Sequence, residues 1–100
     1  MTLVPSKGGL TTRKLILDMI EVARGLSLEP RTYWINQLEN ADSIAGYYPL
    51  GEEIWSQSNG QIDAFVHSVG AAASSRGIAT VLKRHKPGIR NIVVEPAESP

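Results

Sequence analysis

Residues 63–100 constrain the fold most, because strand, small-residue and helix patterns follow one another there without a break. Residues 62–69 form a near-continuous apolar run, which is typical of a buried strand in a parallel sheet. A turn of small residues follows at 70–74, then a helical pattern to His85 and a second short strand at 91–94. This order predicts a strand–turn–helix–strand unit with parallel strands.

The turn Gly70-Ala-Ala-Ala-Ser74 is a candidate anion site. The first N–H groups of the helix that follows lack intrahelical acceptors, and the helix dipole favours an anion beside them. The turn is not a Walker loop, because no Gly-Lys-Ser/Thr follows, and it lacks the later glycines of the dinucleotide fingerprint. From these residues alone, close packing of the helix on the strand explains the turn at least as well as anion binding.

The rest of the chain continues the alternation of strands and helices. The further expected elements are a strand over residues 2–5, a helix capped by Thr11 or Thr12 and ending near Gly25, a strand over 32–36 and a helix over 50–58. Residues 37–48 are not assigned. The predicted order is therefore β-α-β-α-β-α-β, an α/β fold with a mainly parallel sheet flanked by helices.

The charge and composition exclude several classes of protein. The chain has 100 residues, ten basic and ten acidic, so it lacks the strongly basic footprint expected of a nucleic-acid-binding protein. A local basic excess at residues 83–90 is interpreted as a helix C-terminus that complements the dipole, with a nucleic-acid contact as the weaker alternative. Without cysteine, a disulfide or a Cys-ligated metal site is impossible. No apolar run approaches the ~20 residues of a membrane span and no signal-peptide pattern opens the chain, so a cytoplasmic location without a membrane partner is expected.

No residue pattern identifies a catalytic or metal-binding site. His67 lies inside a predicted strand and is interpreted as a histidine of the sheet face, whereas His85 belongs to the basic run. Histidines and carboxylates do not occur together at metal-ligand spacing, so we expect no metal site. The four lysines are predicted to lie in loops or on helix surfaces, outside the apolar pockets that activate a lysine as a nucleophile.

Four short sequence segments that occur in a fixed order identify a family more specifically together than any one of them does alone. They are Gly51-Glu-Glu-Ile-Trp55, Asn59-Gly-Gln-Ile-Asp-Ala-Phe-Val66, Val69-Gly70 and Ile92-Val-Val-Glu-Pro-Ala-Glu-Ser-Pro100. Together they resemble the central part of the cysteine synthase and cystathionine β-synthase family, the fold-type II enzymes that depend on pyridoxal phosphate. Upstream, Tyr33-Trp-Ile-Asn-Gln37-Leu-Glu-Asn40 is similar to the Gln-Phe-x-Asn segment of that family, so the resemblance covers nearly the whole chain.

The resemblance implies roles for six residues. Gly70, Ala71, Ala72, Ala73 and Ser74 match the family's Gly-Thr-Gly-Gly-Thr loop, which holds the cofactor phosphate through backbone N–H groups and hydroxyls. Here alanines replace one threonine and two glycines, so the backbone donors remain, one hydroxyl is lost and Ser74 can keep the other. Gln37 matches the family glutamine near the substrate carboxylate.

The resemblance also implies a domain organisation and a reaction. Residues 1–40 match the end of the family's small domain and residues 41–100 the start of its large domain, and the two can form one compact unit in isolation. The implied parent enzyme is a homodimeric lyase or transferase that performs β-replacement or β-elimination on an amino acid. No lysine here matches the family's Schiff-base lysine, so we expect the chain by itself to be inactive. The alternative is a non-catalytic small α/β binding or interaction module.

Overall fold

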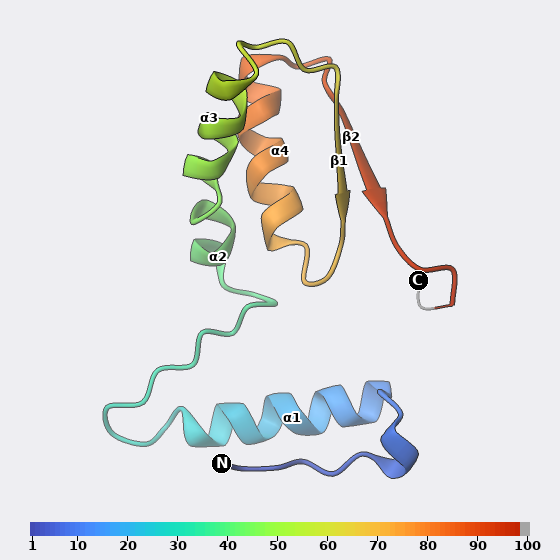
Figure 1. The fold of residues 1–100 in the computed structure, drawn as a ribbon. Helices are drawn as coiled ribbons and strands as arrows, with labels where there is room; N and C mark the ends of the chain where they lie inside the picture. The colour runs from blue at the N-terminus through green and yellow to red at the C-terminus, as the bar shows by residue number, and fades with distance from the viewer. Residues whose placement is uncertain (99–100) are drawn as a thin grey trace. The chain divides into compact units, whose positions relative to one another are not determined.

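The chain divides into two compact units in a computed structural model that describes residues 1–98. The first unit is Met1–Ile35 and the second begins at Asn36. The first contains a 3₁₀ turn, η1 (Lys7–Gly9), and the helix α1 (Arg13–Leu26). The elements of the second unit, in chain order, are α2 (Ala41–Ala45), α3 (Tyr48–Gln57), β1 (Ala64–Ser68), α4 (Ala73–His85) and β2 (Arg90–Val94), as Figure 1 shows.

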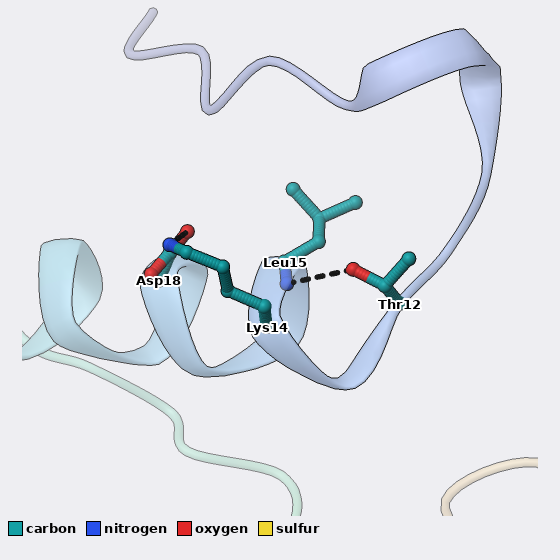
Figure 2. A network of polar contacts seen from close by, with 4 residues as sticks. All are labelled: Thr12, Lys14, Leu15 and Asp18. Atoms are coloured by element: carbon teal, nitrogen blue, oxygen red, sulfur yellow. Dashed lines mark hydrogen bonds and ion pairs between the residues drawn. The ribbon is translucent and has the colours of Figure 1, made fainter.

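The start of α1 is fixed by a side-chain cap. Thr12 is the N-cap residue, and its Oγ1 accepts a hydrogen bond of 3.1 Å from the backbone N–H of Leu15 (Figure 2). In the first turn of the helix, Lys14 Nζ lies 2.6 Å from Oδ2 of Asp18, one turn further on, and both side chains are exposed. The capping bond satisfies one of the helix's unpaired N–H donors, which confirms the cap predicted from the sequence.

The second unit contains the predicted strand–helix–strand segment. β1 and β2 form a parallel pair whose register runs from Ala64 opposite Arg90 to Ser68 opposite Val94. The helix α4 connects the two strands and packs beside them (Figure 1). The apolar core consists of Ile78, Leu82 and Ile89, with Ile54, Trp55, Ile62 and Phe65 packed against it. The α/β class with a parallel sheet flanked by helices is therefore confirmed.

The strands expected over residues 2–5 and 32–36 are wrong. Residues 2–5 have no regular secondary structure, and Pro5 has no N–H to donate to a strand ladder. Residues 32–36 form a loop that ends at Asn36, whose φ of 46° is left-handed and incompatible with a continuing strand. Among the described residues, β1 and β2 are the strands of the sheet, and three helices precede β1 in place of alternating strands and helices.

Two glycines allow the helices of the second unit to approach closely. A Cβ atom at Gly51 of α3 would lie 2.7 Å from the Cβ atom of Val81 on α4. A Cβ atom at Gly77 of α4 would clash with the carbonyl oxygen of Ile44 and lie 2.6 Å from the Cβ atom of Tyr47. Separations this short are absent between real Cβ atoms and their neighbours, so α4 can pack here only because both residues lack a side chain.

We expect Gly77→Ala to lower the free energy of unfolding by about 1–3 kcal/mol, because the added methyl group overpacks the contact between α4 and the segment around Ile44. The matched control is Gly88→Ala, because a Cβ atom at Gly88 would meet no atom within 4 Å. Urea denaturation of both variants measures the effect. Equal stabilities of the two variants would contradict the packing argument.

The connection from α4 to β2 is tied to the start of β1. Lys86 Nζ donates to the carbonyl oxygen of Ile62 at 2.9 Å and to the carboxylate of Asp63 at 2.6 Å. The backbone N–H of Arg90 donates to the carbonyl oxygen of Asp63 at 3.0 Å. The hydrogen bond from Lys86, and then its charge, hold the pKa of Asp63 below its ordinary value of 3.8.

This lowered pKa predicts an acid-sensitive contribution to stability. The ionised carboxylate of Asp63 stabilises the folded state above pH 3.8, and this contribution is lost as the pH falls through the lower pKa of the folded state. The difference in unfolding free energy between the wild type and Asp63→Asn should therefore shrink between pH 6 and pH 2.5 in urea denaturation. In a Lys86→Met background, the pH-dependent effect of Asp63→Asn should become smaller, because only the charge of Arg90 then lowers the pKa of Asp63. An effect of unchanged size would show that Lys86 is not its main source.

Candidate phosphate-binding turn

The turn between β1 and α4 begins while the chain is still paired with β2. The N–H group of Val69 donates to the carbonyl oxygen of Val94 at 3.3 Å, one residue beyond the end of β1. The chain then leaves the sheet and reaches Ala72, the N-cap residue of α4. In Figure 1 this turn joins the carboxyl end of β1 to the amino end of α4. A turn in this position is where α/β proteins commonly bind ligands.

Ala72 has an unusual backbone conformation. Its φ of 66° and ψ of −1° place it in the left-handed region, which glycine adopts readily and alanine rarely. The sequence resemblance matches this position to a glycine of the family's Gly-Thr-Gly-Gly-Thr loop. The backbone of the turn therefore keeps a conformation suited to glycine although the residue is alanine.

The start of α4 presents backbone donors. The first helical bond runs from the N–H of Arg76 to the carbonyl oxygen of Ala72, at 3.0 Å. The preceding N–H groups, of Ala73, Ser74 and Ser75, make no hydrogen bond within residues 1–98. Their shared direction and the helix dipole give this end of α4 a positive electrostatic potential. Residues 69–75 include no acidic side chain, so an anion that accepts hydrogen bonds from these N–H groups would not be repelled by a charge in the turn itself.

The two serines at the start of α4 have different partners. Ser75 is buried, and its hydroxyl donates to the carbonyl oxygen of Ala72 at 3.0 Å, so it stabilises the turn. Ser74 is half-buried, and its Oγ lies 2.9 Å from Nε2 of His67 on β1. Sequence reasoning placed His67 on the face of the sheet but missed this contact. The spacing of seven residues gives no signal for it, because the contact depends on how α4 begins relative to β1.

Gln37 lies apart from the turn in its hydrogen bonding. It is exposed and occupies the turn that precedes α2. Within the described part of the chain, its side chain makes no hydrogen bond to residues 70–74. The structure therefore brings Ser74 together with His67 but does not link Gln37 to this group.

The basic residues at the end of α4 are engaged within the protein. The His85 ring stacks on Trp55 with a centroid separation of 4.8 Å, and its Nε2 lies 2.6 Å from Glu52 Oε2. The guanidinium of Arg84 lies 5.1 Å from the centroid of the Tyr48 ring. Lys83 Nζ donates to the carbonyl oxygen of Ile89 at 2.9 Å. These contacts support the interpretation of the run as the end of a helix rather than a nucleic-acid-binding surface.

Other types of site find no support among the described residues. Within residues 1–98, no three His, Cys, Asp or Glu side chains lie together in a group that could hold a metal ion. In the same range, no helix has both the length and the apolar character needed to cross a membrane. Two hollows in the first unit, of about 200 and 330 Å³, lie along α1 and contain none of the predicted site residues.

The comparison with known proteins identifies the family of the chain. A family model described as "Pyridoxal-phosphate dependent enzyme" matches residues 2–100. The chain belongs to this family. The parent enzymes of the family use pyridoxal phosphate, so the cofactor implied by the sequence resemblance is confirmed for them.

Relatives within the family are cysteine synthases and similar enzymes. A putative cysteine synthase of Sinorhizobium fredii is 43% identical over 70 residues, which are 70% of this chain and 21% of that protein. An O-acetylserine dependent cystathionine beta-synthase of Bacillus subtilis is 33% identical over 69 residues, 68% of this chain and 22% of that protein. The resemblance to the cysteine synthase and cystathionine β-synthase family is confirmed.

The solved structures agree with this assignment. The structure of a hydrogen sulfide-producing enzyme from Fusobacterium nucleatum matches with a TM-score of 0.76 and 29% identity. The match covers 95% of this chain and 31% of that protein. The present chain thus spans less than a third of the length of each of these three relatives.

The backbone of the turn fits a phosphate group. Three consecutive N–H groups are without acceptors in the described residues, and a Cβ atom at Gly70 would meet no atom within 4 Å, so the approach to the turn is open there. Phosphate is commonly bound by backbone donors of this kind at a helix start. The residues that would hold it are Gly70 to Ser74.

We expect Ala72→Gly to raise the free energy of unfolding by about 1 kcal/mol, because it removes the cost of a left-handed φ at a residue with a Cβ atom. The matched control is Ala73→Gly, one residue later, where φ is negative and the residue is helical. That variant should lose up to about 1 kcal/mol through the poor helix propensity of glycine. Thermal and urea denaturation measure both effects, and a loss of stability in Ala72→Gly would contradict the strain argument.

Proposed function

We propose that this chain is a phosphate-anchoring part of a pyridoxal-phosphate-dependent enzyme of the cysteine synthase type. The observation that carries the proposal is the group of three unpaired N–H donors at the start of α4, at the position that matches the family's phosphate loop. In this proposal, residues 70–74 hold the cofactor phosphate and Gln37 helps to position the substrate carboxylate. Residues 1–40 then belong to the small domain and residues 41–100 to the large domain.

The parent reaction is proposed to be β-replacement or β-elimination on an amino acid, in a cytoplasmic and homodimeric enzyme. When bound, pyridoxal phosphate supplies the electron sink for such chemistry. The contribution of this chain is to bind the phosphate at the helix start and thereby to fix one end of the cofactor.

We also propose that the chain by itself does not catalyse the family reaction. Three lysines already interact within the protein. Lys14 forms an ion pair with Asp18, and Lys83 donates to the carbonyl oxygen of Ile89. Lys86 forms an ion pair with Asp63 and donates to the carbonyl oxygen of Ile62. Lys7 lies in η1 of the first unit and is exposed. Within the second unit, neither Lys83 nor Lys86 hydrogen-bonds to the turn at residues 70–74. Because no lysine of the chain matches the family's Schiff-base lysine either, covalent attachment of the cofactor is not expected. These observations also support the alternative of a non-catalytic binding module with the same fold.

Titration with inorganic phosphate tests the binding site. In ¹H–¹⁵N spectra of the labelled chain, the amide signals of Ala73, Ser74 and Ser75 should shift with phosphate concentration. Ala73→Asp should weaken this binding at least tenfold, because the new carboxylate competes for the donors and repels the anion. Ala41→Asp, at the first residue of α2, adds the same charge at another helix start and should leave the binding unchanged. Unshifted amides at 73–75 would refute the phosphate site.

Borohydride reduction tests the proposed lack of covalent chemistry. The chain is incubated with pyridoxal phosphate, reduced, digested and analysed by mass spectrometry. We expect no stoichiometric adduct on any of the four lysines, whereas a specific adduct on one of them would overturn the proposal that the chain is inactive alone.

A further inference from the structure

The hydroxyl of Ser74 already has a partner at the proposed phosphate site. Ser74 is the second residue of α4, and its Oγ lies 2.9 Å from Nε2 of His67. His67 is the fourth residue of β1, opposite Val93 of β2. The contact therefore joins the end of the strand to the start of the helix, on either side of the turn that would hold the anion.

The orientation of the His67 ring is restrained by stacking on Phe65. His67 and Phe65 are two residues apart on β1, so their side chains lie on the same face of the strand. Their rings stack with a centroid separation of 5.5 Å and an interplanar angle of 21°. Phe65 in turn packs against the core formed by Ile78, Leu82 and Ile89. The imidazole is thus held between an apolar support and the serine hydroxyl.

The direction of the hydrogen bond decides what Ser74 can offer to an anion. A hydroxyl has one proton to donate. If Ser74 donates this proton to an unprotonated Nε2, none is left for a phosphate oxygen. If Nε2 carries a hydrogen, it donates to Ser74 Oγ, and the hydroxyl proton is free. Because a phosphate dianion only accepts hydrogen bonds, it favours the second arrangement.

We propose that His67 is a positioning residue for the cofactor phosphate, because its Nε2–H donates to Ser74 Oγ and leaves the Ser74 hydroxyl proton free for the anion. This inference rests on the proposed phosphate function of residues 70–74. Hydrogen bonds in such a chain polarise one another, so the donor from His67 also makes the serine hydroxyl a better donor. A contact that only joins strand to helix would keep the same hydrogen-bond direction whether or not phosphate is present.

The first experiment observes the imidazole directly. Long-range ¹H–¹⁵N spectra of the labelled chain at pH 8, where an ordinary imidazole is neutral, report which ring nitrogen of His67 carries the hydrogen. On addition of inorganic phosphate, we expect the Nε2 signal to move toward the protonated position. The variant Ser74→Ala should abolish this response. A phosphate-independent Nε2 signal in the wild type, at a phosphate concentration that shifts the amides of 73–75, would overturn the inference.

The second experiment measures affinity in matched variants. His67→Phe keeps a ring that can stack on Phe65 but removes the donor, and we expect phosphate binding to weaken about three- to tenfold, as for one hydrogen bond. His67→Gln retains an N–H donor and should bind phosphate more tightly than His67→Phe. The backbone amide spectrum of each variant reports whether it remains folded, and the wild-type imidazole measurement does not depend on either variant.

The outcomes separate this inference from the proposed function. If phosphate shifts no amide at residues 73–75 of the wild type, the phosphate site itself is refuted and the role of His67 falls with it. If the amides shift but His67→Phe binds phosphate as well as the wild type, the site stands and the positioning role of His67 is refuted.

Discussion

The burial of one face of α4 is the constraint on which the second unit depends. Val81 and Leu82 are fully buried, and the helix can reach this depth because Gly51 and Gly77 remove side chains from its contacts with α3 and α2. Burying an aliphatic side chain of this size contributes about 1.5–3 kcal/mol. The cost of a left-handed alanine at Ala72, about 1 kcal/mol, is smaller than that. The core therefore fixes α4 relative to β1, and the turn adopts the conformation that this placement requires.

The position of α4 bears on how the proposed phosphate site would tolerate its alanines. The proposed anion donors are backbone N–H groups, which the replacement of threonine or glycine by alanine leaves in place. The alanines raise the conformational energy of the turn and remove one side-chain hydroxyl. Neither change removes the backbone N–H donors. The covalent chemistry of the family, in contrast, needs a particular lysine, and such chemistry cannot be retained by the backbone alone. Phosphate anchoring and covalent catalysis therefore depend on different kinds of residue.

The sequence predicted the part of the fold in which local patterns and tertiary contacts agree. The strand–helix–strand segment lies within two residues of its expected bounds, because the two strands pair in parallel and Phe65 of β1 packs against the core that α4 contributes to. The burial typical of such apolar strands is not seen in β2, whose residues are all exposed. The pattern at residues 32–36 is equally typical of a strand, but the left-handed Asn36 follows it and a loop results. The helix α2 was not assigned, because five residues are too few to show helical periodicity. The phosphate turn could be proposed from the resemblance, whereas the contact between His67 and Ser74 could not, because it depends on the relative position of two elements.

The contact between His67 and Ser74 also follows from the chemistry of serine. The family loop has threonine at this position, and a β-branched side chain has a restricted χ1 angle, so its hydroxyl direction is limited by the side chain itself. Serine lacks the methyl group and loses that restriction. In this chain the imidazole of His67, supported by Phe65, supplies an external restraint at 2.9 Å from the hydroxyl oxygen. The hydrogen bond between His67 and Ser74 thus restrains the hydroxyl direction that the methyl group of threonine would otherwise restrain. In the proposed role of His67, this restraint differs from the methyl branch in one respect, because its donor and acceptor roles change with what the hydroxyl binds.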